Sequence, residues 1–139
     1  MSQVIVLDTH IWIWFVTQEF ELFPSHWREA IETADQVGVS PVSCYEVALA
    51  QQRRRLELPC SVDRWLEDAL EPTGITLFPL TAEIAYQAVS RSPVHKDPFD
   101  RLIIATALVY KAKLASIDSL FSQYSELDTQ LMRSTERLT

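Results

Sequence analysis

Five acidic side chains stand where a parallel α/β sheet would bring them to one edge. They are Asp8, Glu46, Asp97, Asp100 and Asp118. The first and the last follow short apolar runs at 4–7 and 114–117, and the other three lie in the expected first turns of two helices. In a doubly wound sheet, strand carboxyl ends and the following helix starts meet at one rim, where ligands bind. Carboxylates gathered there would repel one another, so we expect a divalent metal to hold them.

The donor set favours a hard cation. All five side chains offer oxygen, and the chain has no Cys/His quartet, which favours Mg²⁺ or Mn²⁺ over structural zinc. Mg²⁺ keeps several waters and uses few carboxylates together with substrate phosphate. A carboxylate cluster that binds such a metal can activate water for in-line attack on a phosphodiester, with one or two ions.

Each acid also has a purely structural explanation. The Ser-x-x-Glu spacing that ends at Glu46 has the form of a capping box, and Asp97 could cap a helix. Asp100 could favour a helix dipole, and Asp118 could belong to a turn. Two acids resist this account, because Asp8 ends a buried strand and Asp100 lies on a helix that is apolar almost all round. A buried carboxylate is costly to ionise unless it is paired, hydrogen-bonded or bound to metal.

Other polar residues near the acids could support them. Thr9 and Ser43 could hold water at a metal, or could simply cap helices. Arg101 could bind the scissile phosphate or pair with an acid. His10 and His95 lie beside the expected site, although an isolated histidine is more often structural than catalytic.

The elements that would position these residues alternate between strands and helices. Continuous apolar runs predict strands at 3–8, 37–40, 75–80 and 113–117, with a weaker edge strand at 128–135. Helices, each counted with its predicted cap, are expected at 9–16, 25–34, 43–56, 61–70, 81–90 and 97–111. This alternation implies right-handed crossovers and a parallel sheet, an α/β fold within a single domain over residues 1–139.

Composition limits the partners. The net charge of −7 argues against a broad basic surface for nucleic acid, although bound metal would offset several charges. The basic run at 53–55 is either a solvated helix face or an RNA contact. No apolar run reaches the roughly 18 residues of a membrane span, and the N-terminus lacks the basic start of a signal peptide. Cys44 and Cys60 lack CxxC spacing, so we expect free thiols, a cytoplasmic location and no membrane contact.

These residues together resemble a known family. The resemblance rests on Asp8 after a buried strand, Glu46 in Ser-x-x-Glu-Val-Ala, the stretch His-Lys-Asp-Pro-Phe-Asp-Arg-Leu-Ile-Ile-Ala at 95–105, and Asp118 before Ser-Leu-Phe. The chain resembles the PIN-domain ribonucleases over nearly its whole length, and most closely the VapC-type toxins of toxin–antitoxin pairs. The Asp-Pro-Phe-Asp-Arg segment is the most specific part of the match.

The resemblance implies a three-layer α/β/α sandwich with a central parallel sheet and a Mg²⁺- or Mn²⁺-dependent endoribonuclease. It also implies a small antitoxin protein as partner and frequent homodimerisation. By the resemblance, Asp8 and Asp100 are expected to ligate metal, and Glu46 and Asp118 to complete the site. Asp97 is an additional acid, which could be a further ligand or only a helix cap.

Alternatives from other classes remain. A PIN fold without catalysis would only bind RNA or a partner, and related folds also cleave DNA at defined structures. A receiver-type regulatory domain fits poorly, because Thr9 and His10 follow Asp8 in place of a second acid. An Asp-x-Asp phosphatase fails for the same reason, and two glycines are too few for a Gly-rich phosphate loop.

Overall fold

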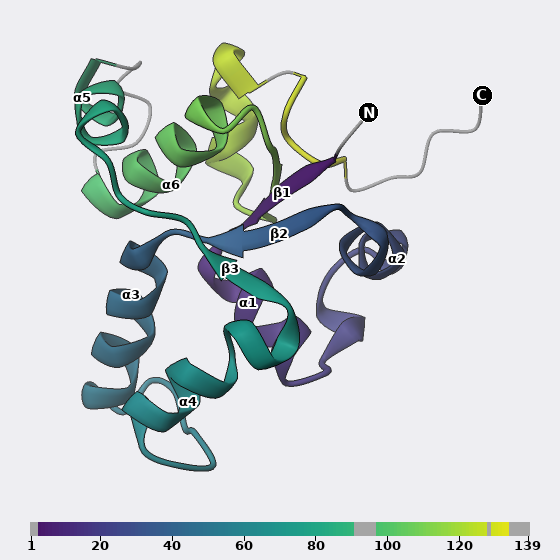
Figure 1. Cartoon of the computed structure of the whole chain (residues 1–139), viewed down its shortest axis with the longest axis vertical. Helices are drawn as coiled ribbons and strands as arrows, with labels where there is room; N and C mark the ends of the chain where they lie inside the picture. Colours follow the sequence, from purple (N-terminus) through teal and green to yellow (C-terminus); the bar gives the residue numbers. More distant parts are fainter. Residues whose placement is uncertain (1–2, 91–96, 128, 134–139) are drawn as a thin grey trace.

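The centre of the structure is a parallel sheet with the strand order β3–β2–β1–β4 (Figure 1). The structure is a computed structural model, and it describes residues 3–90, 97–127 and 129–133. The strands are β1 (Val4–Leu7), β2 (Gln36–Val39), β3 (Ile75–Leu77) and β4 (Lys113–Ala115). The parallel sheet and the places of its strands are therefore as predicted, and the strand ends differ by up to three residues.

Helices connect the strands. The α-helices are α1 (Thr9–Val16), α2 (Ser25–Thr33), α3 (Pro41–Gln52), α4 (Val62–Asp68), α5 (Ala82–Ser90) and α6 (Pro98–Val109). Short 3₁₀ helices are η1 (Phe20–Leu22), η2 (Glu71–Thr73), η3 (Ser119–Gln123) and η4 (Ser125–Leu127). In the described part of the chain, none of the helices combines the length and the apolar character needed to cross a bilayer.

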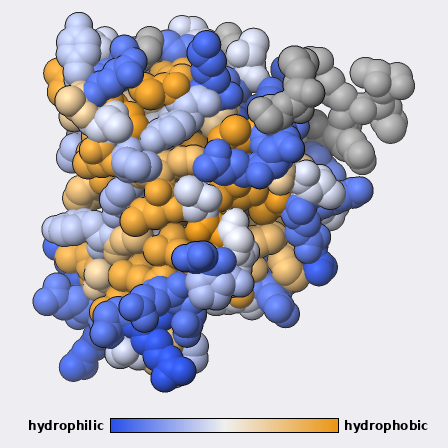
Figure 2. Space-filling view, viewed as in Figure 1, coloured by the Kyte–Doolittle hydropathy of each residue, from blue (hydrophilic) through white to orange (hydrophobic). Residues whose placement is uncertain are grey.

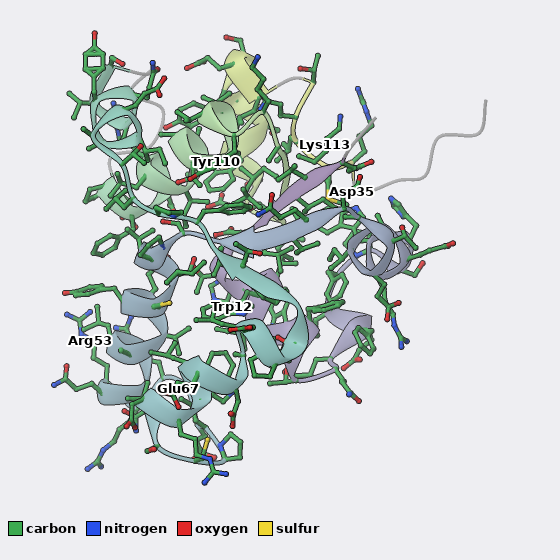
Figure 3. All side chains as sticks on the ribbon, in the orientation of Figure 1. Trp12, Asp35, Arg53, Glu67, Tyr110 and Lys113 are labelled. Carbon is green, nitrogen blue, oxygen red and sulfur yellow. The ribbon has the colours of Figure 1, made fainter. Side chains whose placement is uncertain are left out.

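Alternating side chains of β1 divide the core into two halves. Ile5 and Leu7 pack on one face of the sheet with Trp12, whereas Val6 packs on the other face with Ile103. Figure 1 accordingly shows α5 and α6 on one side of the sheet and α1, α2 and α4 on the other. Trp12 lies in the interior (Figure 3), where its indole Nε1 donates to the carbonyl of Ala69 at 2.9 Å. The predicted three-layer α/β/α sandwich is confirmed.

The sheet has its topological switch point between β1 and β4. The chain proceeds from β1 to β2 to β3 in one direction, and β4 then pairs with the opposite side of β1. In this pairing Leu7 lies opposite Ala115, and the backbone N–H of Asp8 donates to the Ala115 carbonyl at 2.9 Å. Asp8 and Ser116 therefore leave the sheet side by side. Ligands of open α/β sheets bind outside the strand carboxyl ends at this kind of point.

Gly38 in β2 lets the ring of Phe78 pack directly against the backbone of that strand. A Cβ built on Gly38 would overlap the backbone carbonyl oxygen of Thr76 and lie 2.6 Å from the Phe78 ring. Phe78 is 2% exposed and belongs to the core on the α6 side of the sheet. The small residue is thus required by close approach of the neighbouring strand and ring.

Two predicted helix caps were wrong. The N-cap of α1 is Asp8, and Thr9 is the first helical residue. At α2 the cap position belongs to Pro24, without a side-chain capping bond, and Ser25 begins the helix. Since Asp8 is the capping residue, the hydroxyl of Thr9 is available for other contacts.

The predicted capping box of Ser43 and Glu46 was also wrong. Helix α3 begins at Pro41, and the hydroxyl of its N-cap, Ser40, accepts from the N–H of Val42 at 3.2 Å. Proline suits the first helical position because the N–H that it lacks would have no partner inside the helix. Ser43 and Glu46 are therefore inside the helix. It ends at Gln52, four residues before the predicted end.

The predicted edge strand at 128–135 is reduced to a single pairing. Leu131 forms an isolated parallel bridge with Leu114 of β4. Residues 128, 134 and 135 lie outside the described part of the chain, as do His95 and Lys96.

Candidate metal centre

Asp8 is held at the end of β1 by two hydrogen bonds. Its Oδ1 accepts from the N–H of Thr9 at 2.8 Å, and its Oδ2 accepts from the hydroxyl of Ser116 at 2.7 Å. Burial raises the pKa of Asp8, and the bonds from Ser116 and Thr9 oppose that rise. Ser116 is 6% exposed and its hydroxyl also accepts from the N–H of Asp118 at 3.1 Å. One serine thus joins the acid after β1 to the acid after β4.

Sequence reasoning missed Ser116. The residue lies inside a predicted apolar strand, where a serine gives no signal of its own. The register of β1 against β4, which places the residue after Ala115 beside the residue after Leu7, is the signal that identifies it.

Glu46 is held by a chain of hydroxyls. The Oγ atoms of Thr9 and Ser43 lie 2.8 Å apart, and Oγ1 of Thr9 lies 2.6 Å from Oε1 of Glu46. Thr9 has a single hydroxyl proton, so in this chain Ser43 donates to Thr9 and Thr9 donates to Glu46. Burial raises the pKa of Glu46, and the bond from Thr9 opposes the rise. Thr9 and Ser43 therefore orient a carboxylate, and their predicted role in holding water at a metal stays a prediction.

Asp97 and Asp100 open helix α6, as predicted. Oδ1 of Asp97, the N-cap, accepts from the N–H of Phe99 at 2.9 Å, and Pro98 is the first helical residue. Asp100 is partly buried on a helix whose residues 103–107 are all buried. A carboxylate in that setting is costly to ionise.

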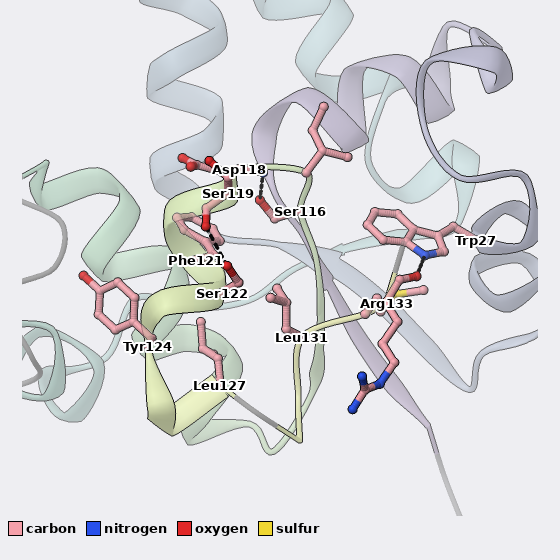
Figure 4. Close-up of a pocket in the computed structure, with 12 residues that line it drawn as sticks. Trp27, Ser116, Asp118, Ser119, Phe121, Ser122, Tyr124, Leu127, Leu131 and Arg133 are labelled. Atoms are coloured by element: carbon pink, nitrogen blue, oxygen red, sulfur yellow. Dashed lines mark hydrogen bonds between the residues drawn. The ribbon is translucent and has the colours of Figure 1, made fainter. Parts of the chain in front are cut away.

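Asp118 begins η3 and borders a groove. Its Oδ1 accepts from the N–H of Leu120 at 2.9 Å, which makes it the N-cap of that short helix. The groove has a volume of about 710 Å³, and its wall on the η3 side includes Ser119 and Phe121. Trp27 and Arg133 form the opposite wall (Figure 4). The groove thus leads directly to one acid of the set.

The other four acids act electrostatically on Asp100. Burial is the largest cause that raises the pKa of Asp100, to about 7. The carboxylates of the other four acids raise it further, in the order Asp97, Asp8, Glu46 and Asp118. Carboxylates from three other segments, together with Asp97 of the same helix start, therefore act on this one carboxylate. These interactions agree with acids gathered at one edge of the sheet, and the role of the five acids as a metal site stays a prediction.

The two basic residues near the acids, His10 and Arg101, make different contacts. His10 is exposed, stacks on Trp14 with ring centroids 5.6 Å apart, and lowers the pKa of both Asp8 and Glu46, so it does lie beside the acids. Nε of Arg101 donates to the carbonyl of Ala88 at 2.8 Å, a contact that ties α6 to the end of α5. Its Nη2 donates to the carbonyl of Val89 at 2.9 Å, and the predicted contact with a phosphate or an acid stays a prediction.

The basic run at 53–55 lies away from the acids. It follows the last residue of α3, and Figure 3 shows Arg53 at the periphery of the molecule. All three arginines are exposed. A helix of 12 residues is about 18 Å long. The run is thus separated by the length of α3 from the rim where that helix begins.

The donor set fits a divalent cation, although the acids do not form a closed cage. Among residues 3–90, 97–127 and 129–133, no three His, Cys, Asp or Glu side chains are grouped closely enough to hold a metal ion. Mg²⁺ needs no such cage, because it binds through one or two carboxylates and completes its shell with waters and substrate phosphate. Burial, and after it the neighbouring carboxylates, raise the pKa of Asp100, and a nearby cation would offset both.

Comparison with known proteins identifies the family of the chain. A family model described as PIN domain matches residues 5–127. Ribonuclease VapC22 of Mycobacterium tuberculosis is 33% identical over 117 residues, which cover 82% of this chain and 86% of that protein.

Solved structures show the same fold at low sequence identity. The chain matches a structure of VapBC2 from Rickettsia felis bound to a promoter DNA fragment, with a TM-score of 0.67 and 12% identity over 94% of this chain and 98% of that one. A toxin–antitoxin complex from Klebsiella pneumoniae matches with a TM-score of 0.60 and 16% identity, over 95% and 98% of the two chains. The resemblance inferred from the sequence is confirmed: the chain belongs to the PIN-domain family and, within it, to the VapC ribonucleases.

Proposed function

We propose that this protein is a divalent-metal-dependent endoribonuclease and the toxin of a toxin–antitoxin pair. Its membership of the VapC ribonucleases supports RNA as the substrate. The observation that carries the metal-dependent chemistry is the rim itself, where four carboxylates and burial together raise the pKa of Asp100 to about 7. Groups whose pKa is shifted by burial and by neighbouring charges cluster at functional sites.

The proposed metal ligands are Asp8 and Asp100, with Glu46 and Asp118 binding directly or through water. Asp97 is a further candidate, although one of its oxygens caps α6. Mg²⁺ and Mn²⁺ both suit oxygen donors of this kind. When bound, such an ion supplies Lewis-acid chemistry and counter-charge at the scissile phosphate.

The chain's own residues orient the reaction. Ser116 fixes Oδ2 of Asp8, and Thr9 fixes Oε1 of Glu46, so both carboxylates keep one direction. Burial raises the pKa of Glu46, which favours it as the group that accepts a proton from the attacking water. Its Oε2 is the proposed acceptor atom, since Oε1 already accepts from Thr9.

Protein partners belong to the same proposal. The solved structures of this fold include a toxin–antitoxin complex, which supports a small antitoxin as partner here. Figure 2 shows apolar side chains gathered in the middle of one face, over β3 and beside α3. Leu77 in β3 and Leu80 just after it are 43% and 45% exposed. Such a surface is suited to an antitoxin or to a second copy of the chain.

The deciding experiment is cleavage of total RNA by the purified protein. We expect cutting with Mg²⁺ or Mn²⁺, none with EDTA, and none by Asp100→Asn. Glu67→Gln makes the matched change from acid to amide on the exposed side of α4 and should cut like the wild type. Cutting by Asp100→Asn at the full rate would contradict the assignment. Metal binding or RNA binding without cutting would favour the non-catalytic PIN-fold module.

A genomic observation tests the toxin assignment separately. A short open reading frame for a DNA-binding protein beside this gene would support an antitoxin. Co-purification of its product with this chain, and loss of RNA cleavage in that complex, is the expected result. Full cleavage in the presence of excess product would contradict the pairing.

A further inference from the structure

An aromatic pair joins the two helices that carry acids of the rim. The ring centroids of Tyr45 on α3 and Phe99 on α6 lie 5.0 Å apart, with the ring planes tilted by 45°. Tyr45 is 55% exposed, and Phe99 is partly buried. Most large aromatic side chains of a folded chain are buried, so an exposed ring supported by a second ring indicates a contact surface.

The pair lies beside the acids in both helices. Tyr45 directly precedes Glu46, and Phe99 directly precedes Asp100. One turn before Tyr45, Val42 is 7% exposed and belongs to the same core as Ile103 of α6. Tyr45 therefore continues the packed face that α3 presents to α6, at the point where that face reaches solvent.

The charge of the chain makes an uncharged contact with RNA valuable. The net charge is −7, and all the proposed metal ligands are carboxylates. Phosphate attraction normally supplies much of the affinity for nucleic acid, and here it is opposed. Stacking of a base on an aromatic ring needs no positive charge and accepts every base, because each base has a π-face.

We propose that Tyr45 and Phe99 form a stacking subsite for one unpaired nucleobase of a single-stranded RNA substrate. The inference rests on the proposed action on RNA and adds where a base next to the reacting phosphate is held. Tyr45 presents the open ring, and Phe99 supports it from α6. The subsite recognises an unpaired base, since a base within a duplex has no exposed face.

Equilibrium binding tests the subsite without requiring cleavage. The probes are a short labelled single-stranded RNA of mixed sequence and the same backbone with abasic sites, both in Mn²⁺. The protein is the full chain with Asp100→Asn, which prevents cutting. We expect the normal RNA to bind about tenfold more tightly than the abasic RNA, and Tyr45→Leu to remove most of that difference. Tyr45→Phe keeps the ring and should retain it.

Tyr86→Leu is the matched control, because Tyr86 is another exposed tyrosine, on α5, with 66% of its surface accessible. The protein with Tyr86→Leu added to Asp100→Asn should bind each of the two RNAs with the same affinity as the protein with Asp100→Asn alone. Phe99→Leu is a second test, and Tyr45→Leu remains informative if the Phe99 variant fails to fold. Equal binding of normal and abasic RNA would overturn the subsite. A Tyr45→Leu protein that still binds normal RNA more tightly than abasic RNA would overturn it as well. A Tyr45→Leu protein that loses self-association while RNA binding is unchanged would assign the pair to a protein interface and would also overturn it.

Different results would contradict the proposed function and the proposed subsite. If the wild-type protein cuts no RNA while normal RNA still binds more tightly than abasic RNA through Tyr45, the subsite stands and the nuclease assignment falls. If cutting is metal-dependent and Tyr45→Leu cuts and binds like the wild type, the nuclease stands and the subsite falls.

Discussion

The hydroxyl of Ser116 donates a 2.7 Å hydrogen bond to Oδ2 of Asp8, a residue 108 positions earlier in the chain. The same hydroxyl accepts from the N–H of Asp118 at 3.1 Å. The contact with Asp8 follows from the pairing of β1 with β4, which sets Leu7 opposite Ala115 at the switch point of the sheet, whereas the contact with Asp118 is local. Two acids from opposite ends of the sequence are thus oriented by one buried side chain.

Ser116→Ala should weaken the metal site while leaving the fold intact. Loss of a group that orients a metal ligand costs about 10- to 100-fold in metal affinity or activity. We therefore expect Mn²⁺ affinity and RNA cleavage to fall together within that range, as measured by calorimetry and by cutting of a labelled RNA. Ser125→Ala removes a hydroxyl from the exposed 3₁₀ helix η4 and should change neither quantity. Unchanged Mn²⁺ affinity in Ser116→Ala would show that the bond to Asp8 does not orient a ligand.

Thr9→Val should reduce stability more than Thr9→Ser. Thr9 is 6% exposed, and valine keeps its shape while removing the hydroxyl that links Ser43 to Glu46. Leaving buried polar partners without their bond costs about 1 to 3 kcal/mol. Serine keeps the hydroxyl and loses only a methyl group. Urea unfolding at fixed pH compares the variants, and equal free energies of unfolding for the valine and serine proteins would contradict the hydroxyl chain.

Sequence reasoning located the acids because their positions follow from simple local rules. Apolar runs that end in Asp8 and Asp118 mark strand ends, and Asp97 before Pro98 marks the start of α6. A parallel sheet then brings these places to one edge, whatever the details of the loops. The placement of these acids after strands and at a helix start was therefore predictable without knowing any side-chain contact.

The contacts that orient the acids were not predictable in the same way. The spacing of Ser43 and Glu46 fits a capping box, and it equally places both residues on one face of a helix that has already begun. Only the tertiary structure shows that this face meets Thr9, 34 residues earlier. Ser116 was missed for the same reason, since its role depends on a neighbouring strand.

Gly38→Ala should destabilise the protein strongly although the change is one methyl group. The added Cβ would overlap the carbonyl oxygen of Thr76, which belongs to the paired strand and has little freedom to move, and would lie 2.6 Å from Phe78. Overpacking of this kind costs about 1 to 3 kcal/mol or more. Gly74→Ala is the comparison, because its Cβ meets nothing within 4 Å and its cost arises only from a φ of +78°. That cost is about 1 kcal/mol. Thermal unfolding of both variants should show the larger loss for Gly38→Ala, and the reverse order would contradict the close approach at β2.

Asp100 should make the stability of the metal-free protein fall as pH rises through neutrality. Its pKa is raised to about 7 in the folded chain, whereas an aspartate in an unfolded chain titrates near about 4. Between these values the folded state binds more protons than the unfolded state. The free energy of unfolding therefore decreases with increasing pH over that window. The stabilisation is complete below about pH 4 and is lost as pH rises through about 7.

Asp100→Asn removes the charge that causes this loss. In EDTA at about pH 8 we expect the variant to be more stable than the wild type by on the order of 1 to 3 kcal/mol, a range reduced for partial solvent screening. Urea unfolding from about pH 5 to pH 8 measures the difference, and Glu67→Gln provides the control on an exposed acid. Addition of Mn²⁺ at about pH 8 should stabilise the wild type by mass action and should have little effect on Asp100→Asn. If the wild-type and Asp100→Asn curves run parallel across this range, burial and the neighbouring carboxylates do not raise the pKa of Asp100 in the folded chain, and the main physical argument for a cation at this site is lost.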